Sequence, residues 1–290
     1  MPEPLLVSVA RVRKALAGRS MARFIEALGT SDTERDKEIA LLIRAAQADF
    51  ETHCGVCLFH TRIVTRPAPP DMVRRSASEV GDYDRLEDGH SYFQDDFRSG
   101  GAVSVKLTKR PVLSIESAGL HWGAWQNSNF LWKFPKGWTM PEARLGYVHI
   151  APAWGGGAAS GQGGILTIPL AYTGIGTRGQ AMPILLAINY TAGFVPYEFN
   201  ADTDDLHDAC PDFEQIRIVA EGVRSLAALK ILKQTRFAKG AGGGSIAIDG
   251  ISQTHANNRF ADEIKEMAAD VDAAKAVLKE SMSGASFMFA

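Results

Sequence analysis

Apolar residues recur at helical spacing near the start of the chain. Residues three and four apart share one face of a helix. The stripe comprises Ile39, Ile43, Ala46, Phe50 and Cys54. Asp32 places negative charge at the positive end of this helix, and Gly55 suits its C-terminal cap. The pattern predicts a helix from Asp32 to Cys54, preceded by shorter helices over Val7–Leu16 and Met21–Leu28.

A second long helix is predicted from Phe213 to Phe237, after Pro211, and it carries two apolar stripes. One stripe is Ile216, Val219, Val223 and Leu226, and the other is Ile218, Leu229 and Leu232. A surface helix needs only one apolar face. We therefore expect this helix to be fully buried or to pack both on its own core and on a neighbouring subunit.

A narrower apolar pattern follows the glycine-rich joint Gly240–Gly244. It repeats every three or four residues at Phe260, Ile264, Met267, Val271, Ala274 and Leu278. Such a heptad seam is typical of a helix that lies on another helix or surface. Beyond it, Phe287 and Phe289 form an apolar tip with no evident intramolecular core. We expect the seam and the tip to contact a partner, together with Ile218, Leu229 and Leu232.

Between the helices the pattern changes to short β runs. They are Leu58–Arg66, Val103–Leu107, Val112–Leu120, Tyr147–Ile150, Ile165–Tyr172 and Ile184–Thr191. Pro67–Pro70 marks a boundary, since proline ends strands. The fold class is thus α+β: a helical core with a β-rich insertion and a C-terminal extended or helical tail. The segments are 1–66 (N-terminal core), 67–182 (insertion), 183–239 (strand and long helix) and 240–290 (joint and tail).

Composition narrows the class of protein. The chain has 290 residues, a net charge of −2 and no dominant basic patch, which disfavours a dedicated nucleic-acid binder. No apolar stretch approaches the roughly 18 residues of a membrane-spanning helix, so none is expected. Three cysteines are too few for a disulfide framework and indicate a reducing compartment.

The cysteines form one candidate for chemistry. Cys54 and Cys57 are spaced C-x-x-C, and His207 and Cys210 share that spacing further along. Four such ligands are able to hold a tetrahedral zinc ion. A redox role is disfavoured, because the pair follows a helix rather than opening one. Free cysteine also packs as a small hydrophobe, and the pattern favours that interpretation over zinc.

Two loops resemble ligand sites in composition. Gly174–Gly179 matches G-x-G-x-x-G, but Pro183 and an apolar strand follow where a dinucleotide site needs a helix. The acidic loop 202–208 lacks the glycine and glutamate positions of a twelve-residue calcium loop. We interpret the first as a glycine-rich loop and the second as a solvated cap of the next helix.

The tryptophans lie together in the β-rich insertion. They are Trp122, Trp125, Trp132, Trp138 and Trp154. Tryptophans anchor β cores and protein interfaces, and we favour this role here. They also stack on sugars, so a glycan-binding module is the alternative.

No G-x-S-x-G, H-E-x-x-H or phosphate-binding loop motif is present. We expect a protein that is not an enzyme and has no cofactor or bound metal.

Three segments, taken in order, resemble the head–tail connector (adaptor or head-completion) family of tailed bacteriophages. They are Asp36–Gly55, Leu107–Ser117 with its Pro111-Val112 pair, and Asn189–Phe194 followed by Pro211 and the alanine-rich helix. The resemblance covers about half of the chain. The insertions between Pro67 and Val103 and between His121 and Met182 exceed those of a minimal member, and the tail after Gly240 is extra.

The resemblance implies a non-enzymatic virion protein at the head–tail interface, made in the host cytoplasm. Its partners would be its own copies, commonly twelve in a ring, the portal protein, and terminator or completion proteins of the tail or neck. DNA would pass through the ring during genome ejection without sequence-specific binding, and no membrane is involved. The alternative is a glycan-binding module of a virion or cell surface on a helical base.

Overall fold

A computed structural model describes residues 4–19, 21–66, 85–91, 103–122, 132–150, 184–238, 246–248, 251–253 and 261–282. The chain divides into two compact units. The β unit comprises Gly55–Tyr197, and the helical unit comprises Glu3–Cys54 with Glu198–Ser281. The α+β class predicted from the sequence is confirmed. None of the described helices is both long and apolar enough to cross a membrane.

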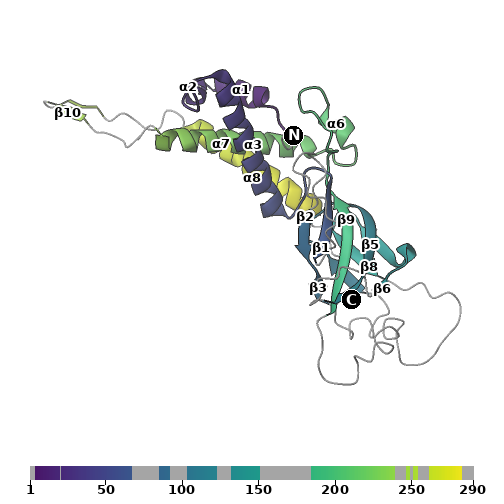
Figure 1. Cartoon of the computed structure of the whole chain (residues 1–290). Coiled ribbons are helices and arrows are strands. Elements are labelled where there is room, and N and C mark those ends of the chain that lie inside the picture. The colour runs from purple at the N-terminus through teal and green to yellow at the C-terminus, as the bar shows by residue number, and fades with distance from the viewer. Residues whose placement is uncertain are drawn as a thin grey trace, which may run out of the picture. The chain divides into compact units, whose positions relative to one another are not determined.

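The helical unit is built around two long helices that pack against each other, α3 and α7 (Figure 1). Its helices are α1 (Val9–Gly18), α2 (Ala22–Glu26), α3 (Asp32–Cys54), α6 (Leu206–Ala209), α7 (Ile216–Ala238) and α8 (Ala261–Met282). The bounds of α3 match the prediction, and those of α1, α2 and α7 differ from it by a few residues.

Helix α3 starts at Asp32 because a reciprocal cap precedes it. The Glu34 backbone N–H donates to Ser31 Oγ over 3.2 Å, and Glu34 Oε2 accepts from the Ser31 N–H over 3.3 Å and the Thr30 N–H over 3.0 Å. Two unpaired donors of the first turn are thereby satisfied. The hydrogen bonds from Thr30, first from its hydroxyl, hold the pKa of Glu34 below its usual value. The helix ends before Gly55, whose φ of 63° is left-handed, as its sequence position predicts.

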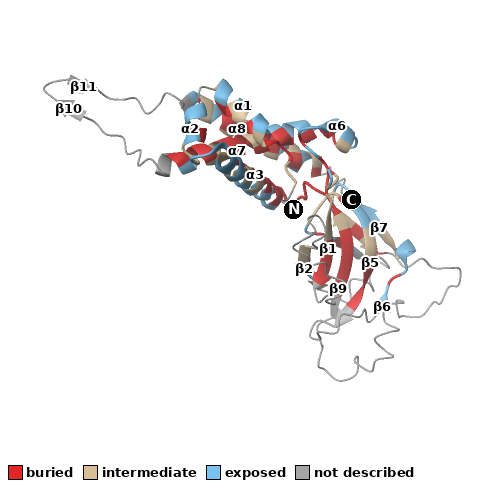
Figure 2. Cartoon of the chain, turned by 45° about the horizontal axis from the view of Figure 1, so that its top comes forward, coloured by how far each residue is buried: buried red, intermediate tan, exposed pale blue. Residues whose placement is uncertain are grey.

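The predicted apolar stripe of α3 and most of the first apolar stripe of α7 lie in the core of the helical unit. Ile39, Ile43, Ala46 and Phe50 of α3 are fully buried. On α7 the buried residues are Ile216, Val219, Val223, Ala227 and Ile231. A buried glutamine also ties the N-terminal segment to α3, since Gln47 Oε1 accepts from the Leu6 N–H over 2.9 Å. Figure 2 shows the buried side of α3 in red and its outward side in pale blue.

The β unit contains two sheets. Its strands are β1 (Thr61–Arg66), β2 (Arg85–Asp88), β3 (His90–Ser91), β4 (Val103–Lys106), β5 (Val112–Trp122), β6 (Trp132–Lys133), β7 (Thr139–Glu142), β8 (Tyr147–Ile150) and β9 (Ile184–Ala192). The six-stranded sheet has the order β2-β1-β9-β5-β6, with β3 also paired to β9, and the three-stranded sheet has the order β4-β8-β7. β5 and β9 form the longest antiparallel pair, which makes β9 central.

One apolar cluster fills the β unit, and both sheets contribute to it. Its members include Ile63, Val105, Val112, Leu120, Phe134, Val148, Ile150, Leu186, Ile188 and Tyr190. Trp138, in the short 3-10 helix η1 (Lys136–Trp138), packs against this cluster and stacks on Phe134 at a centroid distance of 6.1 Å. This tryptophan therefore anchors a core, as favoured from the sequence.

The boundaries between the two units differ from the segment boundaries predicted from the sequence. Strand β1 was placed with the N-terminal helices and β9 with the long helix α7. Both belong to the β unit instead, because Thr61, Arg62 and Ile63 pair with Ala192, Thr191 and Tyr190 in one sheet. The boundaries at 66 and 183 are thus replaced by boundaries near Gly55 and Tyr197. Helix α8, assigned to a separate tail, is part of the helical unit.

A hairpin between α7 and α8 was not predicted. Strands β10 (Ile246–Ile248) and β11 (Ile251–Gln253) pair in antiparallel register, with Ile248 opposite Ile251. In the sequence, the dipeptide Asp249-Gly250 between the two strands is typical of a β-hairpin. The expected strand Ile165–Tyr172 and the loop Gly174–Gly179 lie outside the described residues.

Candidate functional site

The apolar seam of α8 is buried inside the helical unit. Met267, Val271, Ala274 and Leu278 are at most 5% exposed, and Ile264 is half-buried. The seam was predicted to lie on another helix or surface, and the chain's own helices provide that surface. The burial of these residues therefore needs no second protein, and their proposed contact with a portal or a neighbouring subunit stays a prediction.

The contact between α7 and α8 is close enough to demand a glycine. A Cβ added to Gly222 would lie 2.3 Å from the Cβ of Ala274 and 3.0 Å from Phe50 Cζ. Ser225 Oγ donates to Asp270 Oδ2 over 2.9 Å beside this contact. Backbones approach this closely only where small residues face each other.

The three apolar residues singled out on α7 differ in exposure. Leu232 is buried, Leu229 is half-buried, and the side chain of Ile218 is 44% exposed. Of these, Ile218 presents the most apolar surface to solvent. Phe260, Phe287 and Phe289 lie outside the described residues.

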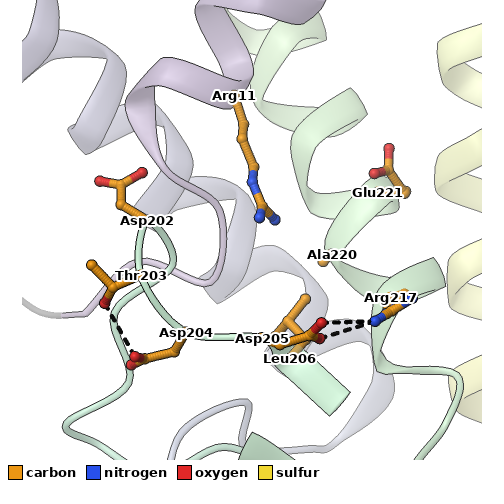
Figure 3. A pocket seen from close by; sticks show the side chains of 9 residues that line it. All are labelled: Arg11, Asp202, Thr203, Asp204, Asp205, Leu206, Arg217, Ala220 and Glu221. Carbon is orange, nitrogen blue, oxygen red and sulfur yellow. Dashed lines mark hydrogen bonds and ion pairs between the residues drawn. The ribbon is translucent and has the colours of Figure 1, made fainter. Parts of the chain in front are cut away.

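A polar pocket lies in the helical unit between α1, the acidic loop and α7 (Figure 3). Its volume is about 410 Å³, and it is lined by Arg11, Asp202, Thr203, Asp204, Asp205, Leu206, Arg217, Ala220 and Glu221. Arg11 extends from α1 into the space between the loop and α7 (Figure 3). Most of the side chains that line it are charged or polar, so it is suited to binding polar groups.

One side of the pocket is organised by Asp205. Its carboxylate accepts from the His207 N–H over 2.8 Å and so caps α6, and it also binds Arg217 Nη2 with both oxygens at 3.0 Å. These interactions, the backbone hydrogen bond first, hold the pKa of Asp205 below its usual value. The expectation that the loop caps the next helix is confirmed for this residue.

The rest of the acidic loop bonds to itself. Asp204 Oδ2 accepts from the Asn200 N–H over 2.7 Å, and the Asp202 N–H donates to Asn200 Oδ1 over 3.0 Å. These hydrogen bonds hold the backbone of the loop in its conformation.

Within the described part of the chain, no group of three or more His, Cys, Asp or Glu side chains is arranged to hold a metal ion.

The four candidate zinc ligands do not form a site. Cys54, Cys57 and Cys210 form no disulfide and are buried, whereas His207 lies on α6 with its side chain 58% exposed. Cys57 belongs to the apolar cluster of the β unit, and Cys54 and Cys210 belong to the helical unit. Burial raises the pKa of the Cys210 thiol to about 11, which keeps it protonated and unreactive at neutral pH.

A buried polar cluster surrounds the tyrosine of the Asn189–Phe194 motif. Tyr190 is fully buried, and its hydroxyl donates to Glu87 Oε2 over 3.1 Å and accepts from the Lys109 N–H over 3.3 Å. Thr108 Oγ1 also donates to Glu87 Oε2. Burial, followed by the charge of Glu87, raises the pKa of Tyr190. The sequence singled out Tyr190, but nothing in the pattern pointed to Glu87.

Asn189, the residue before Tyr190 in the Asn189–Phe194 motif, connects three strands through hydrogen bonds. Asn189 Oδ1 accepts from the Thr65 N–H over 2.9 Å, and its Nδ2 donates to Ser117 Oγ over 3.1 Å. Thr65 Oγ1 in turn donates to the Ile188 carbonyl over 2.8 Å. Buried polar groups of β1, β9 and β5 are satisfied in this way, so the motif has a structural purpose.

A serine, a histidine and a glutamate meet on the outward face of the small sheet. Ser104 Oγ lies 2.7 Å from His149 Nδ1, and His149 Nε2 lies 3.5 Å from Glu142 Oε2. The side chains of His149 and Glu142 are 40% and 48% exposed. Water therefore solvates all three groups, and the arrangement favours a polar contact across β4, β8 and β7 over an activated nucleophile.

Comparisons with known proteins include a weak match to a solved structure. No family model matches the chain, and no curated protein sequence matches it. A solved structure described as "Virion of native gene transfer agent (GTA) particle" contains a chain that is 17% identical, with a TM-score of 0.33. The match covers 78% of this chain and 81% of that chain.

Proposed function

We propose that this chain is a structural virion protein, a head–tail adaptor whose copies form a ring on the portal and continue the DNA channel toward the tail. The proposal begins with the order of the three segments that resemble adaptor proteins. It is supported most by the hydrogen bonds that join the second and third segments within the β unit.

The second and third segments are hydrogen-bonded to each other and to the residues that directly follow the first segment. The Cys57 N–H, just after Gly55, donates to the Arg110 carbonyl over 2.9 Å. The Gly193 N–H donates to the Pro111 carbonyl over 3.0 Å. The Val195 N–H then donates to the Leu58 carbonyl over 3.0 Å. Residues spread over nearly half of the sequence thus form one hydrogen-bonded structural motif.

The charge of the chain agrees with a channel through which DNA slides. A net charge of −2 provides no strong electrostatic hold on phosphates. The expected partners are the other copies of the chain, the portal protein and a terminator or completion protein of the tail or neck.

The C-terminal tip is the proposed portal contact. Deleting residues 245–290 would be a poor test, because Met267, Val271 and Leu278 belong to the core of the helical unit. Replacing Phe287 and Phe289 together by serine changes none of these three core residues. We expect at least a tenfold loss of portal affinity, because two aromatic rings would no longer be buried.

The matched control replaces Ser283 and Ser286 of the same segment by alanine, and portal affinity should then stay within twofold. Affinity would be measured by biolayer interferometry on the portal protein of the same particle. Unchanged binding of the phenylalanine variant would contradict the portal role of the tip.

The glycan-binding alternative gains no support from the described tryptophan side chain. Trp138 is partly buried and packs on the apolar cluster of the β unit, stacked on Phe134. We therefore do not propose glycan binding as a second function.

A further inference from the structure

The polar pocket of the helical unit presents one positive and one negative group that its own residues leave unpaired. Arg11 extends into the pocket from α1, and Asp202 lines it from the acidic loop (Figure 3). Their backbone N–H groups donate to Ser8 Oγ over 3.3 Å and to Asn200 Oδ1 over 3.0 Å. Among the described residues, none forms a hydrogen bond or an ion pair with the Arg11 guanidinium or the Asp202 carboxylate.

The other charged groups of the pocket already have partners. Asp205 binds Arg217, and Glu221 pairs with Arg224 one turn along α7. Both carboxylate oxygens of Asp204 accept hydrogen bonds within the loop. The two unpaired groups are therefore the ones available to a ligand, and a ligand needs charges of both signs to satisfy them.

A row of three side chains crosses the outward face of the three-stranded sheet. Lys106 of β4 lies opposite Tyr147 of β8, and Tyr147 lies opposite Glu142 of β7. Their neighbours Val105 and Val148 are buried in the apolar cluster, so the row points away from the core. Lys106 and Glu142 are exposed, and two strand spacings, about 10 Å, separate them. We call these three residues the charged row.

The two charges of the charged row are also unpaired within the described chain. Lys106 Nζ lies 6.0 Å from the centre of the Tyr147 ring, and no described acid pairs with it. Glu142 Oε2 lies 3.5 Å from His149 Nε2, and no Lys or Arg among the described residues pairs with this carboxylate. The row therefore presents a cation and an anion on either side of an aromatic ring, and tyrosine is enriched among the residues that dominate protein interfaces.

The pocket and the charged row are complementary in both signs of charge. Lys106 matches the carboxylate of the pocket, and Glu142 matches its guanidinium. Opposite charges placed in this way fix the register of an interface. Duplex DNA suits neither surface, because Glu142 on the row and Asp202 in the pocket would repel its phosphates. A second copy of the chain carries both surfaces, so it is the partner that satisfies all four groups.

We propose that the charged row of one copy docks in the polar pocket of the next copy. Lys106 of the first copy then pairs with Asp202 of the second, and Glu142 pairs with Arg11 in the same contact. The inference rests on the proposed ring function and specifies a subunit contact of that ring. Because the pocket and the row are different surfaces, each copy uses one of them for the neighbour on either side. Such head-to-tail contacts continue from copy to copy until a ring closes.

Charge reversal in two separate variants of the full chain tests this contact. Asp202→Lys and Lys106→Glu each bring like charges together, so each variant alone should form at least tenfold fewer rings than the wild type in mass photometry. Mixed in equal amounts, the two variants should form rings again. The altered pocket of one variant accepts the altered row of the other, and the unaltered surfaces meet at every second contact. A contact within one chain would not be restored by mixing.

Exposed residues away from both surfaces provide matched controls. Lys133→Glu on β6 and Asp272→Lys on α8 introduce the same charge changes, and each should form rings as the wild type does. Circular dichroism checks that all four variants fold. Rings of unchanged abundance in Asp202→Lys or Lys106→Glu alone, or no rescue on mixing, would overturn the contact and leave the ring function intact. A wild-type chain that stays monomeric, alone and with the portal, would overturn both.

The second ion pair provides an independent readout. Arg11→Glu and Glu142→Lys should each fail to form rings alone and should form them when mixed. A mixture of Arg11→Glu with Lys106→Glu should not close rings, because every contact between that pocket and that row then gathers acids. Closed rings from this mixture would contradict the assigned pairs. Rings that persist in Lys106→Glu while the chain loses affinity for duplex DNA would assign the row to DNA instead.

Discussion

Gly193 occupies a backbone conformation that other residues rarely adopt. Its φ is +144°, and an added Cβ would lie 2.4 Å from the Phe59 carbonyl oxygen and 2.6 Å from the His60 nitrogen. We predict that Gly193→Ala lowers the free energy of unfolding by at least about 2 kcal/mol, since both strain and a backbone clash result. Urea unfolding measures the change.

Gly137 is the matched control in the same unit. An added Cβ there meets nothing within 4 Å. Gly137→Ala should therefore change the free energy of unfolding by less than about 0.5 kcal/mol. Equal effects of the two substitutions would show that the junction at Gly193 is not as tight as described.

Tyr190 makes the β unit sensitive to alkaline pH. The pKa of Tyr190 is raised in the folded protein, whereas a tyrosine in the unfolded chain has a pKa of about 10. The unfolded chain therefore loses this proton first, and stability falls as the pH rises above about 10. Tyr190→Phe should lower stability by about 1–3 kcal/mol at neutral pH, because the Lys109 N–H and Glu87 lose a partner.

Urea unfolding at several pH values checks the sign of this effect. The loss of stability above a pH of about 10 should be smaller in Tyr190→Phe than in the wild type. Parallel curves for the two proteins would mean that the Tyr190 hydroxyl is not the group whose burial matters.

Asp205 tests the electrostatics of the pocket. Its pKa is lowered first by the His207 backbone N–H and then by Arg217. We predict that Arg217→Gln raises the pKa of Asp205 but leaves it below the usual value, because the backbone hydrogen bond remains. Carbon-13 NMR of the Asp205 carboxyl measures it, and an unchanged pKa would rule out the ion pair in solution.

The close approach of α7 and α8 gives a prediction about how elements pack. Gly222→Ala should destabilise the chain by about 1–3 kcal/mol, because the new Cβ would lie 2.3 Å from that of Ala274. Ala274→Gly in the same chain should recover part of this loss. The control Gly18→Ala meets nothing within 4 Å and should not destabilise. Additive effects of Gly222→Ala and Ala274→Gly in thermal unfolding would contradict the contact.

Sequence patterns predicted helix ends and apolar faces well, because short-range interactions determine these features. Ser31 and Glu34 fix the start of α3, Gly55 fixes its end, and the heptad spacing marks the buried seam of α8. Spacing alone could not say whether that seam would lie on another subunit or on the chain's own helices. That outcome depends on the small residue at Gly222, which lies far from the seam in sequence.

At the scale of the whole molecule, the sequence could not predict how distant segments combine. β1 and β9 pair although about half of the chain separates them, so neither local pattern reveals the sheet. The partnership of Glu87 with Tyr190 is equally non-local. The resemblance named two of the segments that meet there, Leu107–Ser117 and Asn189–Phe194, but only their hydrogen bonds show why they occur together.

The central claim is that copies of this chain form a ring on a portal. Electron-microscopic class averages of the purified chain, alone and mixed with the portal protein of the same particle, test it most directly. We expect closed rings with a central channel that stack coaxially on the portal. A chain that stays monomeric in both samples, with no added density on the portal, would contradict it.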